Sequence, residues 1–290
     1  MRDPSSLPCV LPRAGPAEPP SAPMAATEAA LEAFYFKPAK ALLHAVELEA
    51  YRRAGVRLTA PVLDLGCGDG AVADLLRRCG VIGEPPACGL DIGAAAVRRA
   101  RRRGAHRTIV RGDACRLPFP AASFNAVVAN AVLCALPAPL HPALAETYRV
   151  LAPGGMLVAS VPTARSRAYL WPSRATPFLP LRLRDRLIAR AEERAEDRIV
   201  LELADWVRSF REAGLEVIAG VPHMGPRTTA ACSLLGLQPL RAFSALRAVP
   251  HLGRRVAARL LERPIRAMMG ADAATDRETA GCALIVARRS

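Results

Sequence analysis

The sequence has almost no lysine, no paired-cysteine motif and no long apolar run. Lys37 and Lys40 are the only lysines, so arginine supplies nearly all of the 40 basic residues behind the net charge of +14. No stretch reaches the roughly 20 uninterrupted apolar residues that a membrane-spanning helix needs. The first residues also lack the apolar run of a signal peptide. We therefore expect a cytoplasmic protein without a membrane-spanning segment.

The cysteines form no Cys-x-x-Cys pair, and no histidine cluster accompanies them, so we expect no zinc or other metal site. They are scattered through apolar segments, where a free cysteine acts as a small hydrophobic residue. This pattern indicates a reducing compartment. The eight cysteines are Cys9, Cys67, Cys79, Cys88, Cys115, Cys134, Cys232 and Cys282.

The arginine excess has two interpretations. A strongly basic protein commonly binds nucleic acid, an acidic membrane surface or an anionic substrate. Alanine and proline are abundant as well as arginine, which fits a biased genome composition equally well. The net charge alone therefore leaves the partner open.

Composition and periodicity divide the 290 residues into three parts. Residues 1–24 are rich in proline and poor in apolar surface, so we expect a disordered tail. Residues 25–60 show helical periodicity that Pro38 interrupts, with Thr27 suited to cap the first helix and Gly55 to end the second. We expect these two helices to form a lid on a domain that spans 61–290.

From residue 61 onward, strand-like segments alternate with helix-like segments, which predicts an α/β fold with helices on both faces of a parallel sheet. A Pro-Gly-Gly turn at 153–155 precedes the fifth strand. Two inserts, 163–202 and 222–280, exceed ordinary connections, and functional additions usually lie in such loops. The expected strands are 61–65, 87–90, 107–111, 124–129, 156–161, 215–221 and 282–287, and the expected helices after them include 71–79, 94–104, 139–151 and 203–213.

A glycine-rich turn follows the first strand in the segment 62–70, Val-Leu-Asp-Leu-Gly-Cys-Gly-Asp-Gly. Glycine at 66, 68 and 70 lets the backbone turn sharply and approach a ligand closely. The next helix then points its unpaired N–H groups at that ligand. This pattern alone also fits a tight structural turn or a dinucleotide-binding dehydrogenase.

Two acidic residues follow at the ends of the next two strands. Asp91 comes directly after the apolar segment 88–90, where a carboxylate can accept hydrogen bonds from ribose hydroxyls. Asp113 follows the third strand in Gly112-Asp113-Ala114. A further segment, 148–155, reads Tyr-Arg-Val-Leu-Ala-Pro-Gly-Gly.

These four motifs, in this order and spacing, resemble the class I S-adenosylmethionine-dependent methyltransferases, and in particular the quinone, sterol and small-molecule branch called methyltransferase type 11. The resemblance covers residues 61–162 well and extends loosely to 206–221. It implies a Rossmann-like sheet of seven strands, mostly parallel with the last strand antiparallel, and S-adenosyl-L-methionine as the cofactor. The implied cofactor residues are Asp64, Gly66, Cys67, Gly68, Gly70, Asp91, Ile92, Asp113, Ala114 and Asn130.

Within that set the resemblance assigns different parts of the cofactor. The turn 66–70 would line the methionine end, and Asp64 or a nearby backbone group would hold the amino group. Asp91 and Ile92 would hold the ribose, and Asp113 and Ala114 the adenine. Asn130 would lie beside the reacting methyl group.

The acceptor can be narrowed by motifs that the chain does not carry. The segment after the fourth strand reads Asn130-Ala131-Val132-Leu133, without the Pro-Pro pair of DNA amino-methyltransferases or the Pro-Cys pair of cytosine-carbon methyltransferases. We expect a small, apolar or lipid-like acceptor and do not expect nucleic acid as the partner. An apolar lid over its pocket is predicted in the first insert from Tyr169, Leu170, Trp171, Phe178, Leu179, Leu181 and Leu183.

The second insert carries a basic amphipathic series over residues 226–269, in which leucines alternate with arginines. Helices of this kind can lie in an anionic membrane surface. We therefore expect peripheral contact with the inner membrane surface through 226–269, although an ordinary helical layer with solvated arginines would show the same pattern.

Methyl transfer needs a base only when the acceptor arrives protonated, so the resemblance names no catalytic residue. His44, His141 and His223 are the candidate bases, with Asn130 as a further candidate for the catalytic site. His106 and His251 look peripheral. The alternatives are an RNA or protein methyltransferase that uses the arginine-rich surface, a scaffold protein that only binds the cofactor, and a dinucleotide oxidoreductase, which Asp113 and the Pro-Gly-Gly turn disfavour.

Overall fold

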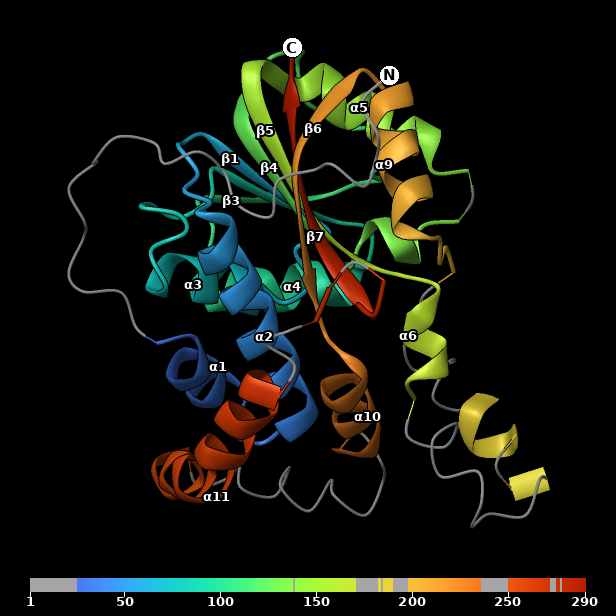
Figure 1. Cartoon of the computed structure of the whole chain (residues 1–290). Coiled ribbons are helices and arrows are strands. Elements are labelled where there is room, and N and C mark those ends of the chain that lie inside the picture. The colour runs from blue at the N-terminus through green and yellow to red at the C-terminus, as the bar shows by residue number, and fades with distance from the viewer. Residues whose placement is uncertain are drawn as a thin grey trace.

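The structure is a computed structural model that describes residues 25–137, 139–170, 182–183, 185–189, 198–235, 250–271, 275–276 and 278–290. Seven strands form one sheet in the order β3-β2-β1-β4-β5-β7-β6. Neighbouring strands are parallel except β7, which runs antiparallel to β5 and β6 (Figure 1). The strands are β1 (Val62–Leu65), β2 (Cys88–Asp91), β3 (Thr108–Arg111), β4 (Phe124–Asn130), β5 (Leu151–Pro162), β6 (Leu215–His223) and β7 (Cys282–Arg289). The predicted seven-stranded fold is therefore confirmed.

Helices cover both faces of the sheet, and the alternation of side chains along each strand decides which residues meet which helices. On one face, Val128 and Val158 pack with α2 (Pro38–Ala54) and α3 (Ala71–Arg78). On the other, Val127 and Leu157 pack with α5 (His141–Val150) and α9 (Leu203–Glu212). The central strands are thus buried on both sides, which explains why they read as continuous apolar runs.

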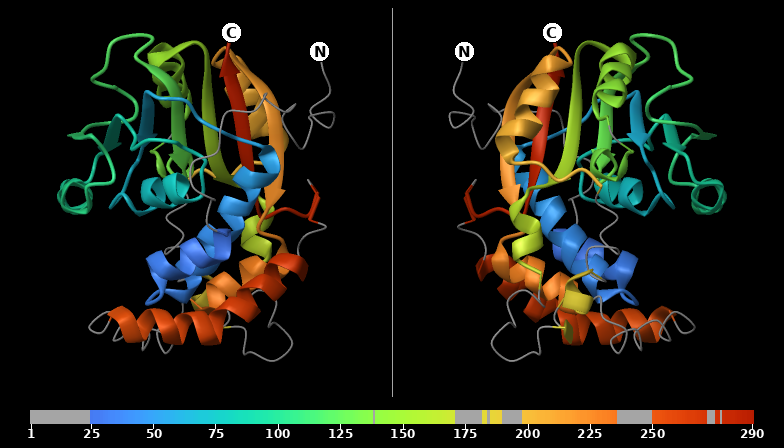
Figure 2. Two further views of the ribbon diagram at one scale, coloured as in Figure 1. Left: turned by 90° about the vertical axis from the view of Figure 1, so that its left-hand side faces the viewer. Right: turned by 90° about the vertical axis from the view of Figure 1, so that its right-hand side faces the viewer.

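A layer of helices lies across the carboxyl ends of the parallel strands. It consists of α1 (Ala26–Phe34), α10 (Pro226–Leu235), α11 (Pro250–Ala271) and the first turns of α2, and we call it the cap. Figures 1 and 2 show the cap below the sheet, with α11 as its outermost helix. Helix α1 packs on α2 and α11, and α10 packs on α2, so segments more than 200 residues apart in the chain build one layer.

The remaining helices are short or peripheral. Helix α4 (Ala94–Arg103) packs against β2 and β3. The 3₁₀-helix η2 (Leu133–Ala135) follows β4, and α6 (Arg165–Ala168) follows β5. Most of the predicted apolar lid lies outside the described residues, as does the tail 1–24; Leu183 is described and is exposed. No helix in the described ranges combines the length and the hydropathy that crossing a bilayer requires.

Local signals placed the ends of α2 correctly. Pro38 stands in its first turn, where the missing N–H costs nothing. Gly55 ends the helix with φ 66°, a left-handed conformation that glycine adopts readily.

Two local predictions are wrong. Thr27 does not cap α1: the N-cap is Ala25, and the Thr27 hydroxyl instead contacts the Met269 sulfur at 3.5 Å. The segment 153–155 is not a turn outside the fifth strand, because β5 already begins at Leu151 and the register shifts opposite Phe124 and Ala126. The extra residues form an irregularity within the strand, and Gly154 takes φ 75° there.

Candidate active site at the carboxyl ends of the strands

The turn between β1 and α3 depends on glycine. Gly66, Gly68 and Gly70 have φ values of 67°, 57° and 80°. A Cβ atom on Gly66 would lie 2.3 Å from a methyl carbon of Val132, in the segment that follows β4. No larger residue fits there, so the turn lies directly against the end of β4. We call residues 66–70 the glycine loop.

Asp91 ties the glycine loop to the end of β2. One carboxylate oxygen accepts a hydrogen bond from the Gly68 N–H at 2.9 Å, and the other accepts one from the Gly93 N–H at 2.7 Å. Each carboxylate oxygen has lone pairs for a further donor, so the group can also accept two ribose hydroxyls. Ile92 beside it is 67% exposed, which offers an apolar surface at the same strand end.

Asp113 lies two residues beyond the end of β3, whose last residue, Arg111, pairs with Asp91. Its side chain is exposed, and one oxygen accepts a hydrogen bond from the Cys115 N–H at 2.9 Å. Ala114 next to it is buried, and a Cβ atom on Gly112 would lie 2.9 Å from Leu90 of β2. The ends of β1, β2 and β3 therefore present the glycine loop and two partly free carboxylates, a set that fits the adenosine and methionine parts of S-adenosylmethionine. The individual contacts stay predictions.

Asp64 has a partner that the sequence did not reveal. Its carboxylate is 5% exposed and lies 2.7 Å from Nε2 of His106. Burial raises the pKa of Asp64, while the hydrogen bond with His106 works in the opposite direction. Because the carboxylate keeps lone pairs besides the one that His106 engages, Asp64 and the backbone of the glycine loop both remain predicted partners for the methionine amino group.

The interpretation of His106 as peripheral is wrong. Its side chain is fully buried beneath the glycine loop, where it lies close to Gly70 and Gly89. A Cβ atom on Gly89 would come within 2.8 Å of the ring, so a small residue at this position of β2 makes room for the imidazole. His106 and Asp64 thus support the loop from below. Cys67 in the loop is also buried, and burial raises the pKa of its thiol, so it acts as a neutral packing group.

A row of polar side chains marks the carboxyl ends of β4, β5 and β6 on the face that α2 covers. Along these strands the positions facing α2 are apolar, such as Val128, Val158 and Val221. Two residues further on, the same rows end in Asn130, Ser160 and His223. Asn130 and Ser160 are neighbours in the register of β4 and β5. We call Asn130, Ser160 and His223 the polar row.

Helix α2 presents its own polar side chains to this row. Tyr51 is completely buried and donates a hydrogen bond from its hydroxyl to Oδ1 of Asn130 at 2.6 Å. Nδ2 of Asn130 is buried without a partner. Burial raises the pKa of Tyr51 well above its ordinary value, so the hydroxyl remains a donor.

Glu47 lies one turn before Tyr51 on α2 and is 4% exposed. His44 Nδ1 is 3.0 Å from its carboxylate. Burial opposes ionisation, but the His44 hydrogen bond, the His44 and His223 charges and a hydrogen bond with Ser160 together hold the pKa of Glu47 below its ordinary value. No local signal in the sequence distinguishes Glu47 from Glu49, which is half-buried and pairs with Arg52.

The structure brings three of the four catalytic candidates together. His44 pairs with Glu47, which interacts with His223, and Tyr51 on the same helix binds Asn130. His223 is 3% exposed, its Nε2 lies 3.4 Å from the Ser160 hydroxyl, and burial lowers its pKa, so the ring is neutral near pH 7. The fourth candidate, His141, is exposed at the start of α5, which packs on the opposite face.

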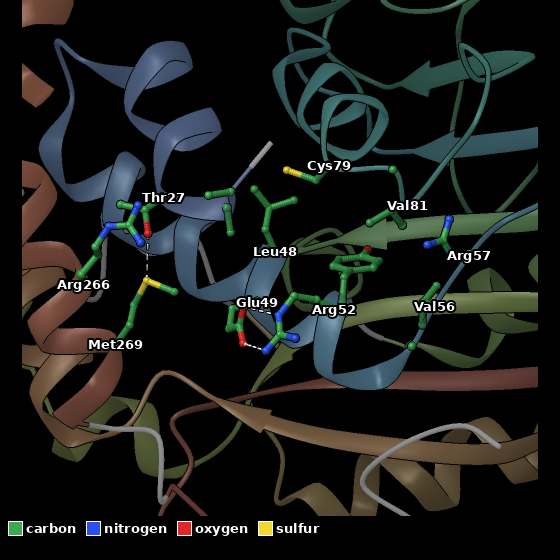
Figure 3. Close-up of a pocket in the computed structure, with 15 residues that line it drawn as sticks. Thr27, Leu48, Glu49, Arg52, Val56, Arg57, Cys79, Val81, Arg266 and Met269 are labelled. Atoms are coloured by element: carbon green, nitrogen blue, oxygen red, sulfur yellow. Dashed lines mark hydrogen bonds and ion pairs between the residues drawn. The ribbon is translucent and has the colours of Figure 1, made fainter. Parts of the chain in front are cut away.

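A pocket of about 580 Å³ lies beside α2, and Tyr51 is one of the residues that line it (Figure 3). Residues from α1, α2, α11 and the segment after α3 line it, among them Arg52, Arg57 and Arg266. None of the cofactor residues lines this pocket.

Comparisons with known proteins agree with the geometry of the cofactor site. A family model described as a methyltransferase domain matches residues 63–159. A Mycolicibacterium smegmatis protein named probable S-adenosylmethionine-dependent methyltransferase is 34% identical over 170 residues, which cover 57% of this chain and 60% of the relative. Demethylmenaquinone methyltransferase of Thermus thermophilus is 39% identical over 120 residues, which cover 37% of this chain and 52% of that protein.

The chain therefore spans about half to three fifths of the length of these curated relatives. Among solved structures, the complex of the Haloferax volcanii Trm112 methyltransferase activator with a methyltransferase contains a chain that aligns with a TM-score of 0.53. The alignment covers 90% of this chain and 97% of the other at 20% identity, so it shows a shared fold. Strand order, glycine loop and family match agree: residues 63–159 match a methyltransferase domain, and the sheet has the fold of the class I S-adenosylmethionine-dependent methyltransferases.

Proposed function

We propose that the protein transfers the methyl group of S-adenosylmethionine to a small, apolar or lipid-like acceptor. The observation that supports this most directly is that the glycine loop and the polar row lie next to each other at the carboxyl edge of the sheet. The glycine loop lies against Val132, two residues past Asn130, and the register of β1 and β4 pairs Asp64 with Val128, each two residues before Gly66 and Asn130. The cofactor residues and the polar row therefore meet at the point where the methionine end of the cofactor is expected.

S-adenosylmethionine supplies an electrophilic methyl group, so the protein mainly has to align the acceptor and exclude water. Asp91 and Asp113 would fix the cofactor by accepting its hydrogen bonds. The cap would shield the reacting atoms, since α2 seals the polar row from one side and α1, α10 and α11 cover α2.

The surroundings of the polar row favour an apolar acceptor. Phe34 and Tyr35 are buried in the cap, and the Phe34 ring stacks on His44 with centroids 4.8 Å apart. One relative is a demethylmenaquinone methyltransferase, which by its name acts on a quinone. Buried aromatic side chains close to a few polar groups are typical of small-molecule sites.

The function is tested by cofactor binding and by the fate of a labelled methyl group. Asp91→Ala removes charge-assisted hydrogen bonds and should weaken S-adenosylhomocysteine binding by about 1–3 kcal/mol in calorimetry. Purified protein with methyl-labelled S-adenosylmethionine and an extract of its own source organism should label the lipid fraction, with Asp91→Ala as the blank. Label in RNA or protein would overturn the acceptor class, and binding of NAD without S-adenosylhomocysteine would overturn the cofactor.

We further propose that α11 holds the protein against an anionic membrane, from which a lipid-like acceptor would be taken. Leu252 and Leu260 are 54% and 58% exposed on this outermost helix. Five arginines are exposed along it, and Glu262 is its only acidic residue; the arginines are Arg254, Arg255, Arg259, Arg263 and Arg266. A helix that exposes apolar side chains among basic ones is suited to the interface of an anionic bilayer.

Vesicle flotation tests this contact. Replacing Arg255, Arg259 and Arg263 by Gln should abolish flotation with vesicles that contain phosphatidylglycerol. The matched control replaces Arg98, Arg99 and Arg102 by Gln, three exposed arginines on α4, which should leave flotation intact. Equal loss of flotation in both variants would show that net charge, and not the α11 surface, causes binding. A salt-dependent affinity for RNA that only the α11 variant loses would favour the RNA alternative.

A further inference from the structure

The contacts of Asn130 carry an inference about the atom that is methylated. The amide orientation is set by Tyr51, whose buried hydroxyl needs an acceptor and finds it in Oδ1 at 2.6 Å. This leaves Nδ2 as the other polar group of the amide, and Nδ2 is buried without a hydrogen-bond partner. A buried donor left unpaired costs about 1–3 kcal/mol, so its retention beside the methyl-transfer point indicates a ligand atom that accepts its hydrogen bond.

The chemistry of that ligand atom follows from its lone pairs. An amine nitrogen has one lone pair, which it must use to attack the methyl carbon. A hydroxyl oxygen has two, so it can accept a hydrogen bond from Nδ2 and still attack. A donor at this point therefore selects oxygen over nitrogen as the nucleophile.

A hydroxyl nucleophile also has to lose a proton, and the polar row provides a route. Ser160 is the neighbour of Asn130 in the sheet, and its hydroxyl is 3.4 Å from Nε2 of His223. Glu47 also interacts with His223 through its charge. The carboxylate of Glu47 can therefore balance a positive charge on the His223 imidazole.

The groups facing His223 are consistent with a proton acceptor that starts neutral. Burial lowers its pKa, Glu47 and the Val221 carbonyl raise it, and Arg53 lowers it again. His44 lies beyond Glu47 and holds that carboxylate at 3.0 Å, while Cys282 is the register partner of His223 on β7. Among these groups, Glu47 is the single anion beside the imidazole.

We propose that the acceptor is a hydroxyl compound, that Nδ2 of Asn130 binds its oxygen, and that its proton leaves through Ser160 to His223 with Glu47 as the counter-charge. The oxygen forms a bond to the methyl carbon while the carbon–sulfur bond breaks, its electron pair staying on sulfur, and the hydroxyl proton ends on the imidazole. Asn130 is then a catalytic residue, and Tyr51, which acts through it, is a positioning residue. This inference rests on the proposed methyl transfer.

The first experiment replaces Asn130 by Asp, which keeps the shape and removes the donor. Loss of one transition-state donor typically lowers the turnover number 10²–10³-fold, and we expect this range with S-adenosylhomocysteine affinity within about twofold of the unchanged protein. Tyr51→Phe should lower turnover less and raise KM for the acceptor. The matched control is Asn125→Asp at the other end of β4, where the side chain bonds the Ala60 carbonyl, and it should behave like the unchanged protein.

The possible outcomes distinguish a failure of this inference from a failure of the proposed function. If the unchanged protein neither binds S-adenosylhomocysteine nor transfers label, the proposed function fails. If it transfers label and Asn130→Asp does so equally well, or if Asn130→Asp loses cofactor affinity tenfold or more, only the present inference fails. Carbon-13 NMR of the labelled product decides the atom: an O-methyl signal supports the inference, and an N- or C-methyl signal overturns it.

A titration provides a readout that does not depend on activity. NMR of the His223 imidazole should show a lower pKa in Glu47→Gln than in the unchanged protein, because the raising effect of the carboxylate is lost. In the pH–activity profile of His223→Gln, the fall in activity at acidic pH (the acid limb) should disappear. An unchanged His223 titration in Glu47→Gln, or an acid limb that survives in His223→Gln, would remove the proton route.

Discussion

On the β1–β3 side of the carboxyl edge, the polar side chains come from strand ends close together in the chain, between residues 64 and 114. On the β4–β6 side they come from α2, β4, β5 and β6, between residues 44 and 223. The first half would bind the cofactor through loops that follow each strand directly, while the second becomes a site only when α2 lies on the sheet. A site whose residues lie in contiguous motifs can be predicted from the sequence, whereas a site that forms only through tertiary packing cannot.

The largest loss of stability is expected when the buried contact between His106 and Asp64, beneath the glycine loop, is removed. His106→Leu leaves the buried Asp64 carboxylate without its partner, and losing one member of a buried pair typically costs about 3–5 kcal/mol of the free energy of unfolding. Chemical denaturation measures the loss. The double variant with Asp64→Asn should recover part of it, because the uncompensated charge is gone; no recovery would mean that His106 acts through packing alone.

Gly66→Ala tests the contact between the two halves. The new methyl group would overlap Val132, and the residue would have to keep φ 67°, so we expect a loss of about 2–4 kcal/mol and weakened S-adenosylhomocysteine binding. Gly104→Ala is the control, since φ is 70° there but the space is open. It should cost only about 1–2 kcal/mol; equal losses in the two variants would show that backbone strain, not the contact with Val132, dominates.

Tyr51→Phe tests the assembled half. It leaves Oδ1 of Asn130 buried without a donor, so the free energy of unfolding should fall by about 1–3 kcal/mol, while S-adenosylhomocysteine affinity stays unchanged. Denaturation and calorimetry on the same samples separate the two effects. A loss of cofactor affinity as large as the loss of stability would contradict the division into halves.

The smallest effect is a pH dependence of stability from His223. Burial lowers its pKa from the ordinary 6.5, so below that pH the unfolded chain takes up a proton that the folded chain does not. Stability should then fall on acidification, by at most about 1.4 kcal/mol per pH unit, until the pH passes the pKa of the folded state. Denaturation curves between pH 7 and 5 should be flatter in His223→Gln, and parallel curves would assign the slope to other groups.

The sequence predicted the sheet, the glycine loop and the strand-end acids because each depends on neighbours in the chain. Asp91 and Asp113 follow directly after apolar strands, and strand ends were misplaced by only a few residues. His106 escaped notice because its partner Asp64 is 42 residues away and meets it only across β1, β2 and β3. A lone histidine outside any motif has no pattern that reports such a contact.

Glu47 and Tyr51 were not identified as site residues from the sequence for a related reason. A glutamate on a helix is ordinarily solvated, and nothing in the sequence of α2 says that this one faces Ser160 and His223. Their burial follows from where α2 crosses the sheet, a property of tertiary packing. Thr27 shows the opposite error, since a good capping residue lost that role to a contact with Met269, 242 residues away.

The place of β7 in the sheet has a consequence for the order in which the protein is built. Strand β7 lies between β5 and β6, although it leaves the ribosome after both, and residues 224–281 separate it from β6. Chains generally fold from the N-terminal side during synthesis, so β1–β4 and the glycine loop can assemble early. Until β7 emerges, β5 has an open edge and β6 has no neighbour in the sheet. The cofactor half can therefore form before the half that holds Ser160 and His223, which becomes complete only when the last residues of the sheet have been made.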